Sequence, residues 1–175
     1  MRIGIVGMGR VGRAVATRAA AFGCPISYTD LQPIGGVNHT FLADPKLPDP
    51  VFHLATAPGT HADQTGKVMV AYGEVAAAHR PDWLVVVGHV NSTLACALTG
   101  VKLGIPTVHL EAGLRSRDRT IPEEINRIAT DAVADVLWTP SPDGDGNLLA
   151  EGIPAERITR VGNIMLDSFE LVRPA

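Results

Sequence analysis

The fold is decided by the stretch Val85-Val86-Val87-Gly88-His89-Val90-Asn91-Ser92-Thr93-Leu94-Ala95, which is typical of a buried strand, a tight turn and the start of a helix. Apolar β-branched residues fill the strand, Gly88 lets the backbone turn, and Asn91, Ser92 or Thr93 can cap the helix. In a parallel α/β sheet, ligands bind at the carboxyl ends of such strands. His89 is therefore expected at the edge that carries the functional site.

Strand-like and helix-like segments alternate along all 175 residues. This alternation predicts one domain with a three-layer, Rossmann-like, doubly wound and mostly parallel sheet, linked by right-handed crossovers. The expected strands cover residues 2–6, 25–29, 51–55, 82–87, 106–110, 136–138 and 158–161. The expected helices cover a segment ending near 22, then 60–79, 91–103, a segment starting near 122, a segment that includes 147–151, and 163–171.

The composition narrows the function classes. A net charge of −3 and an aromatic content of 5% argue against nucleic acid or an anionic membrane as partner. Cys24 and Cys96 lie in apolar patterns, so we expect buried thiols rather than a metal site or a disulfide. A strand-like segment follows Met1 directly and no apolar run approaches the ~20 residues of a membrane span, so a cytoplasmic protein is expected.

A glycine-rich loop, Gly7-Met8-Gly9-Arg10-Val11-Gly12, follows the first expected strand and opens a helix. Such a loop permits a tight turn, close approach to a pyrophosphate and close packing of the helix, whose amino terminus offers N–H groups to an anion. Asp30 ends the next strand, near the spacing at which an acid binds the ribose of NAD. The pattern predicts an NAD(P) site; a turn kept only for packing is the alternative. The expected cofactor-binding residues are Gly7, Gly9, Arg10, Val11, Gly12 and Asp30.

Residues 2–33 resemble the coenzyme-binding βαβ unit of D-2-hydroxyacid dehydrogenases, particularly the hydroxypyruvate reductase branch. The resemblance is carried by the text from Arg2 to Arg13 and from Ala20 to Tyr28. The catalytic Arg, Glu and His of that family have no counterpart in this chain, so dehydrogenase chemistry is not expected. Residues 34–50 are dense in Pro and Gly and form a junction to the remaining sequence, 51–175.

From about Asn38 to its end, the chain resembles the first domain of non-hydrolysing UDP-N-acetylglucosamine 2-epimerases. Several motifs match in order, and most of them follow expected strands. They are Gly59-Thr-His-Ala-Asp-Gln-Thr-Gly66, Pro81-Asp-Trp83, Asn91-Ser-Thr-Leu-Ala95, His109-Leu-Glu-Ala-Gly-Leu-Arg115, Pro122-Glu-Glu-Ile-Asn-Arg127 and Val161-Gly-Asn163.

This resemblance implies one half of a glycosyltransferase-B arrangement, with a UDP-sugar in the cleft between two domains. Enzymes of this family eliminate UDP to give a 2-acetamidoglucal and add it back with the opposite configuration at C2, an isomerisation that requires no cofactor. The resemblance carries the catalytic roles to Glu111 and Glu123, and to His89, which stands where the family has an acid. Arg115 and Arg127 are expected to orient the carboxylates or to balance their charge.

For several of these residues, a purely structural role remains an alternative to a catalytic one. Glu111 could be a surface residue, and Glu123 with its neighbour Glu124 could simply favour the helix dipole. His109 is equally consistent with a packed core histidine and with a site residue. His61 and His79 are expected to be solvated helix residues.

Two further departures from the family weaken the expectation of catalysis. Arg10 is only a loose substitute for the arginine of the family's opening turn, and the sequence ends where the family's first domain ends. We therefore expect little or no epimerase activity from this chain alone, and self-association through surface that would otherwise face a partner. The alternatives are an NAD(P)-binding Rossmann module, or a ligand-free scaffold in which a dehydrogenase unit completes an epimerase half.

Overall fold

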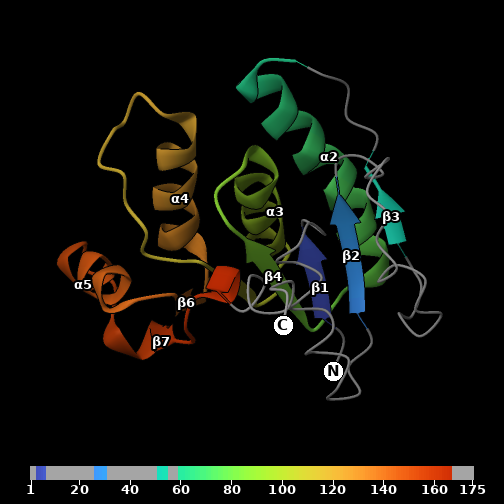
Figure 1. The fold of residues 1–175 in the computed structure, drawn as a ribbon. Helices are drawn as coiled ribbons and strands as arrows, with labels where there is room; N and C mark the ends of the chain where they lie inside the picture. Colours follow the sequence, from blue (N-terminus) through green and yellow to red (C-terminus); the bar gives the residue numbers. More distant parts are fainter. Residues whose placement is uncertain (1–2, 7–25, 31–50, 55–58, 167–175) are drawn as a thin grey trace, which may run out of the picture.

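The computed structural model describes residues 3–6, 26–30, 51–54 and 59–166. Its seven strands form one parallel sheet in the order β3-β2-β1-β4-β5-β6-β7 (Figure 1). The strands are β1 Ile3–Val6, β2 Ile26–Asp30, β3 Val51–His53, β4 Trp83–Val87, β5 Thr107–Leu110, β6 Val136–Thr139 and β7 Ile158–Arg160. The helices are α2 His61–His79, α3 Asn91–Lys102, α4 Pro122–Val133, α5 Pro142–Ala150 and the short η2 Ala155–Arg157.

The sheet is doubly wound, as the alternating sequence predicts. From β1 the chain adds β2 and β3 on one side, then crosses through α2 to β4 and adds the other strands on the opposite side. Every pairing is parallel, with Val6 opposite Val86 and Val86 opposite His109. The order reverses between β1 and β4, and in sheets of this kind ligands bind at the carboxyl edge beside such a reversal.

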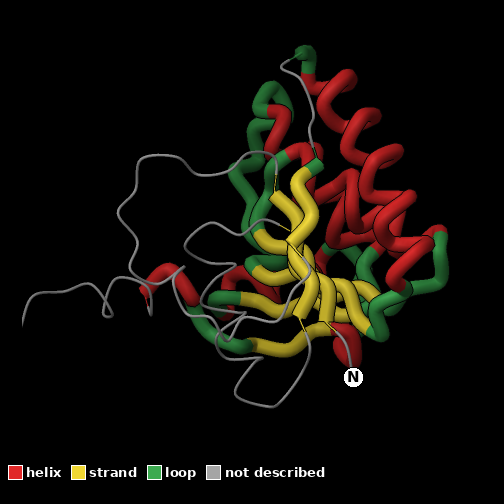
Figure 2. Tube along the Cα trace, turned by 90° about the vertical axis from the view of Figure 1, so that its right-hand side faces the viewer, coloured by secondary structure: helices red, strands yellow, loops and turns green. Residues whose placement is uncertain are grey.

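Strand β4 lies at the centre of the sheet and is buried on both faces. Leu84, Val85 and Val86 are almost fully inaccessible, which accounts for their uninterrupted apolar run. Helices α2, α3 and α4 lie side by side over one face (Figures 1 and 2). Helix α3 comes very close to the sheet, because a Cβ on Gly100 would lie 2.5 Å from Leu84 Cδ2.

The second layer of helices cannot be followed, because the glycine loop, the helix expected to follow it and the junction lie outside the described residues. Cys24 lies there too, whereas Cys96 is buried in α3 as expected. In the part of the chain that the structure describes, no helix is both long enough and apolar enough to cross a membrane.

The structure confirms the start of α2 and corrects the start of α3. Thr60 caps α2 through a reciprocal pair of hydrogen bonds with Asp63. Helix α3 has Val90 at its N-cap and no side-chain cap, so the prediction that Asn91, Ser92 or Thr93 caps it is wrong. The side chains of this turn have other partners: Thr93 donates to the Val87 carbonyl, 2.8 Å away, and Asn91 bonds to neighbouring helices.

Helix α5 contains the residues that the sequence assigns to a helix near 147–151, and the structure shows where it begins. It starts at Pro142, behind the capping hydroxyl of Ser141, and Glu151 is its C-cap. The glycines at 144 and 146 weaken the helical pattern in the sequence, while the cap and the contact with the sheet stabilise it in the fold. The expected terminal helix is seen only at 164–166, and the rest of it lies outside the described residues.

The turn after β5 packs against the start of α5 with no room for a side chain. Gly113 has a φ of +79°, and a Cβ on it would lie 2.4 Å from the Gly144 carbonyl oxygen. Because the obstructing atom belongs to the backbone, rotation of a side chain cannot relieve the clash. This contact sets the distance between the Glu111 turn and α5.

We predict that Gly113→Ala lowers the free energy of unfolding by about 3 kcal/mol, from about 1–2 kcal/mol of left-handed strain plus about 1–3 kcal/mol of overpacking. Gly146→Ala is the matched control, because nothing lies within 4 Å of its added Cβ and it is helical. It should gain about 0.5–1 kcal/mol. Chemical denaturation of both variants checks this, and equal stability of the two would contradict the close-packed turn.

Candidate functional site at the carboxyl edge of the sheet

Three elements bring the predicted catalytic residues together. His89 follows β4 through Gly88, whose φ is +72°, and Glu111 follows the neighbouring strand β5. A Cβ on Gly88 would lie 3.6 Å from Glu111 Oε2, so the Glu111 carboxylate sits against the turn that carries His89. Glu123 stands in the first turn of α4, close enough to affect the charge of His89. The expectation that these three residues meet at one edge agrees with this arrangement.

The three side chains share an unusual property: none of them makes a hydrogen bond to another described residue, although each is partly buried. Two neighbouring carboxylates differ sharply. Glu124 and Asp131 are each 1% exposed, and both are surrounded by donors. Half-buried polar atoms without a hydrogen bond are available to bind a ligand, whereas the carboxylate oxygens of Glu124 and Asp131 already accept hydrogen bonds within the protein.

Burial changes the protonation of His89 and Glu111 in useful directions. Loss of solvent lowers the pKa of His89, and the Arg127 guanidinium lowers it further, while Glu123 acts in the opposite direction. Burial raises the pKa of Glu111, and the positive charge of His109 partly opposes this. The site therefore favours a neutral His89 and a Glu111 that accepts a proton more readily than an exposed glutamate.

The structure separates the roles of Glu123 and Glu124. Glu124 accepts hydrogen bonds from the backbone N–H of Ser116, at 3.0 Å, and of Arg117, at 2.8 Å. Desolvation raises the pKa of Glu124, but these bonds, the Ser116 hydroxyl and Arg127 outweigh it and leave the pKa lowered. Glu124 thus holds the loop after β5. Glu123 makes no hydrogen bond to another described residue and lies close enough to His89 to raise its pKa, and its place in the first turn of α4 also suits the helix dipole.

Arg127 leaves a donor unused beside His89. Its Nη1 donates to Glu124 Oε2 at 2.9 Å, whereas its Nε is buried without a hydrogen-bond partner among the described residues. A buried donor without a partner costs free energy unless water or a ligand accepts from it. Arg127 therefore partners Glu124 rather than Glu111 or Glu123, and keeps one donor for a bound acceptor.

The expectation that Arg115 orients the catalytic carboxylates is wrong. Its guanidinium binds Glu151 with two nitrogens, at 2.6 and 2.7 Å, and donates to Asp131 Oδ2 at 2.7 Å. The sequence analysis did not identify Asp131 as an important residue. An aspartate next to Thr130 on the buried face of a helix could have indicated a buried ion pair. Charged residues are almost never fully buried unless they are paired.

His109 belongs to the core and also contacts the site turn, so neither open alternative is sufficient. It is fully buried, and its ring nitrogens bind Asp131 Oδ1 at 2.6 Å and the Gly88 carbonyl oxygen at 2.7 Å. The same Gly88 carries His89. The ring therefore joins β5 to α4 and to the turn after β4.

A chain of amides joins the starts of three helices at this edge. Asn126 donates to the His89 carbonyl and to Asn91 Oδ1, each at 3.1 Å, and Asn91 donates to Gln64 Oε1 at 2.9 Å. His61 Nδ1 lies 3.1 Å from the Asn91 amide nitrogen. His61 is an exposed residue of α2, as predicted, and it also closes this network.

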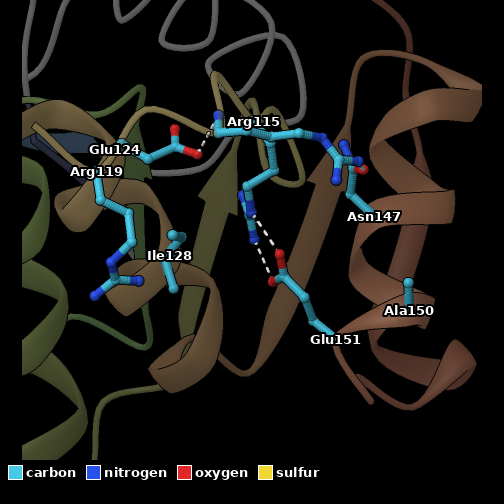
Figure 3. Close-up of a pocket in the computed structure, with 8 residues that line it drawn as sticks. Arg115, Arg119, Glu124, Ile128, Asn147, Ala150 and Glu151 are labelled. Carbon is cyan, nitrogen blue, oxygen red and sulfur yellow. Dashed lines mark hydrogen bonds and ion pairs between the residues drawn. The ribbon is translucent and has the colours of Figure 1, made fainter. Parts of the chain in front are cut away.

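A cavity of about 250 Å³ opens between α4 and α5, beneath the loop that Glu124 holds (Figure 3). Figure 3 shows the guanidinium of Arg115 facing Glu151 inside it. None of His89, Glu111 and Glu123 contributes to its wall, so it lies apart from the carboxyl edge. Its lining residues are Arg115, Arg117, Arg119, Glu124, Ile128, Asn147, Ala150 and Glu151.

The expected cofactor residues are placed only in part. Gly7, Gly9, Arg10, Val11 and Gly12 lie outside the described residues. Asp30 is the last residue of β2, and β2 pairs with β1 in parallel, with Val6 opposite Thr29. Asp30 therefore lies at the same carboxyl edge of the sheet as the ends of β4 and β5.

A doubly wound parallel sheet with ionisable groups at its carboxyl edge defines a Rossmann-like nucleotide-binding fold. The family model for UDP-N-acetylglucosamine 2-epimerase matches residues 35–175, and the chain belongs to this family. The model for the NAD-binding domain of D-isomer specific 2-hydroxyacid dehydrogenases matches residues 1–42. Both resemblances seen in the sequence are thus confirmed.

The relatives support the same assignment. A UDP-N-acetylglucosamine 2-epimerase of Methanocaldococcus jannaschii is 41% identical over 82% of this chain, and a UDP-2,3-diacetamido-2,3-dideoxy-D-glucuronate 2-epimerase of Pseudomonas aeruginosa is 40% identical over 75%. The chain spans only 39% and 38% of these two proteins. The crystal structure of the M. jannaschii enzyme with UDP-GlcNAc and UDP superposes with a TM-score of 0.88 and 33% identity, covering 98% of this chain and 49% of that one.

Glu111→Gln should stabilise the protein at pH 7–8, because burial raises the carboxyl pKa in the folded state and ionisation there costs free energy. The folded state binds the proton more tightly than the unfolded chain. The advantage of the variant should therefore shrink as the pH falls through the folded pKa toward about 4.3, the value of a free glutamate. Glu156→Gln, an exposed position in η2, is the control. Thermal melts of the three proteins across this range check the sign, and an advantage that grows in acid would contradict it.

Proposed function

We propose that the carboxyl edge of this sheet binds a UDP-sugar of the N-acetylhexosamine class and forms half of the cleft of a UDP-N-acetylglucosamine 2-epimerase. One observation carries the proposal. Three partly buried ionisable side chains, His89, Glu111 and Glu123, meet where parallel sheets bind nucleotides, and none of them is used by the fold. Relatives named as epimerases of UDP-N-acetylglucosamine and of a UDP-diacetamido uronate support this substrate class.

The proposed reaction is an elimination followed by an addition. A base removes the proton from C2 of the sugar, the electron pair of that bond forms the C1–C2 double bond, and the bond from C1 to the UDP oxygen breaks. UDP leaves with that electron pair. In the return step UDP adds to C1, and C2 receives a proton on the opposite face. The chemistry needs one group able to accept a proton and another able to donate one.

The environments of His89 and Glu111 suit these two tasks. A lowered pKa keeps His89 neutral and able to accept a proton, and a raised pKa keeps Glu111 protonated, and so able to donate, to a higher pH than an exposed glutamate. Glu123 stabilises the imidazolium that forms when His89 is protonated. The unused Nε of Arg127 is the donor that this edge offers to an acceptor of the ligand.

The described residues by themselves should epimerise a UDP-sugar slowly. In the enzymes that this chain resembles, the cleft lies between two domains, and the described residues form one wall. In such a cleft, both walls together orient the substrate and exclude water from the reacting centre. Binding of the UDP-sugar is therefore the property that tests the proposal most directly.

UDP-GlcNAc should raise the melting temperature of this protein in a thermal-shift measurement. At a hundred times its Kd, a ligand specific for the folded state adds about 2.7 kcal/mol to the free energy of unfolding. His89→Ala should weaken binding about tenfold, which corresponds to about 1.4 kcal/mol. His79→Ala, at the exposed end of α2, is the matched control and should bind as the wild type does. Absence of any shift, or equal binding by both variants, would refute the proposed site.

A second candidate function is binding of a dinucleotide at the glycine loop. It is supported by the NAD-binding family match over residues 1–42 and by the position of Asp30 at the carboxyl end of β2. The described backbone agrees with such a site, because β1 and β2 are parallel and their carboxyl ends, Val6 and Asp30, lie at one edge. Gly7, Gly9, Arg10, Val11 and Gly12 would hold the pyrophosphate, and Asp30 the ribose. NAD(P) would supply a hydride acceptor, but the chain shows no matching dehydrogenase residues.

NAD(H) and NADP(H) belong in the same thermal-shift panel, with Gly9→Trp as the test variant. An indole at this position should fill the space of the pyrophosphate and abolish stabilisation by the dinucleotide while leaving that by UDP-GlcNAc. Gly66→Ala is the control glycine, since nothing lies within 4 Å of its added Cβ. Dinucleotide stabilisation that survives in Gly9→Trp would show that the glycine loop is not the site.

A further inference from the structure

We propose that His109 is a positioning residue which, as a buried imidazolium held between Asp131 and the Gly88 carbonyl, fixes the His89 turn and sets the charge around it. The inference rests on the proposed function only in treating His89 and Glu111 as the working groups. The hydrogen bonds that carry it, at 2.6 and 2.7 Å, belong to the fold itself.

Both partners of the His109 ring are acceptors. The Gly88 carbonyl has no proton to give. Asp131 also receives the Gly113 backbone N–H, at 3.0 Å, and the guanidinium of Arg115, so it acts as a carboxylate that accepts on both oxygens. A neutral imidazole carries one N–H and would leave one of the two acceptors facing a lone pair. The geometry therefore calls for a proton on each ring nitrogen.

The buried charge is balanced within a short series of contacts. His109 pairs with Asp131, Asp131 pairs with Arg115, and Arg115 pairs with Glu151 through two nitrogens. Two positive and two negative groups alternate, with the exposed Glu151 at one end and the fully buried His109 at the other. A buried charge persists in a protein when it is paired and hydrogen-bonded, and each inner member of this series has both.

The other charged groups that act on this region come from the turns around His109. Glu111 follows the same strand, His89 follows β4, and Arg127 lies on α4. The positive charge of His109 lowers the pKa of Glu111 against the effect of burial, and it also lowers that of His89. One ring thus limits the protonation of Glu111 and favours neutral His89, while it holds the Gly88 carbonyl from which His89 projects.

Nitrogen-15 NMR of histidine-labelled full chain tests the proposal without any ligand. In the folded chain, His109 should show two protonated ring nitrogens with slowly exchanging protons, because the ring is fully buried. His89 should titrate below about 6.5, the ordinary value for histidine. A single protonated nitrogen on His109 at pH 7 would overturn the proposal.

His109→Gln removes the charge and should move the titration of His89 upward toward the ordinary range, with circular dichroism showing that the fold remains. Asp131→Asn is the second variant: it keeps the shape, removes the counter-charge, and should leave His109 with one ring proton at pH 7. His79→Gln is the control and should change neither signal. An unmoved His89 titration in folded His109→Gln would refute the role, and so would an imidazolium that persists in Asp131→Asn. If neither variant folds, the two-proton signature of the wild type decides.

UDP-GlcNAc binding is measured separately from these signals. Loss of ligand binding with an intact imidazolium signature would refute the proposed function and leave the positioning role standing. A neutral His109 in a chain that binds UDP-GlcNAc would refute the positioning role and leave the proposed function standing.

Discussion

The arrangement of the carboxyl edge depends on one buried carboxylate, that of Asp131. Its two oxygens receive His109 from β5, the Gly113 backbone N–H from the turn after β5, and Arg115 from the loop beyond. Through His109 the same group reaches Gly88 and so the turn after β4. A buried carboxylate is tolerated because each of these donors replaces lost hydration, and removal of one partner from such a pair costs about 3–5 kcal/mol. The paired strands alone would not determine how these turns meet.

The edge holds several backbones in conformations that side chains disfavour. Glu111 and Arg117 have φ values of +73° and +61°, in the left-handed region. Such strain costs of order 1–3 kcal/mol per residue and persists only where neighbouring contacts enforce it. For Arg117 the enforcing contact is its own N–H, bound by Glu124. For Glu111 the flanking turn is held on Asp131, and the strain places its carboxylate against Gly88 rather than in solvent.

Two families of nucleotide-binding sequence meet in this sheet, and the topology explains why they are compatible. Strands β1 and β2 lie within the dehydrogenase-like match, β4 to β7 lie within the epimerase match, and β1 pairs with both β2 and β4. Since all strands are parallel, both parts present their strand ends at one edge. The two sequence families can therefore share one sheet without a change of fold.

The sequence by itself determined the class and order of the elements, because the period of apolar residues, Gly88 and Thr60 are local signals that act within a few positions. It also placed His89, Glu111 and Glu123 at strand and helix ends that must share one edge. It could not show that Glu124 is hydrogen-bonded within the fold whereas its neighbour Glu123 is not. Nor could it show that Arg115 forms ion pairs with Asp131 and Glu151. Only the tertiary structure decided which charged groups are hydrogen-bonded within the fold and which are available to a ligand. The reason is that their partners lie up to 36 positions away in the chain.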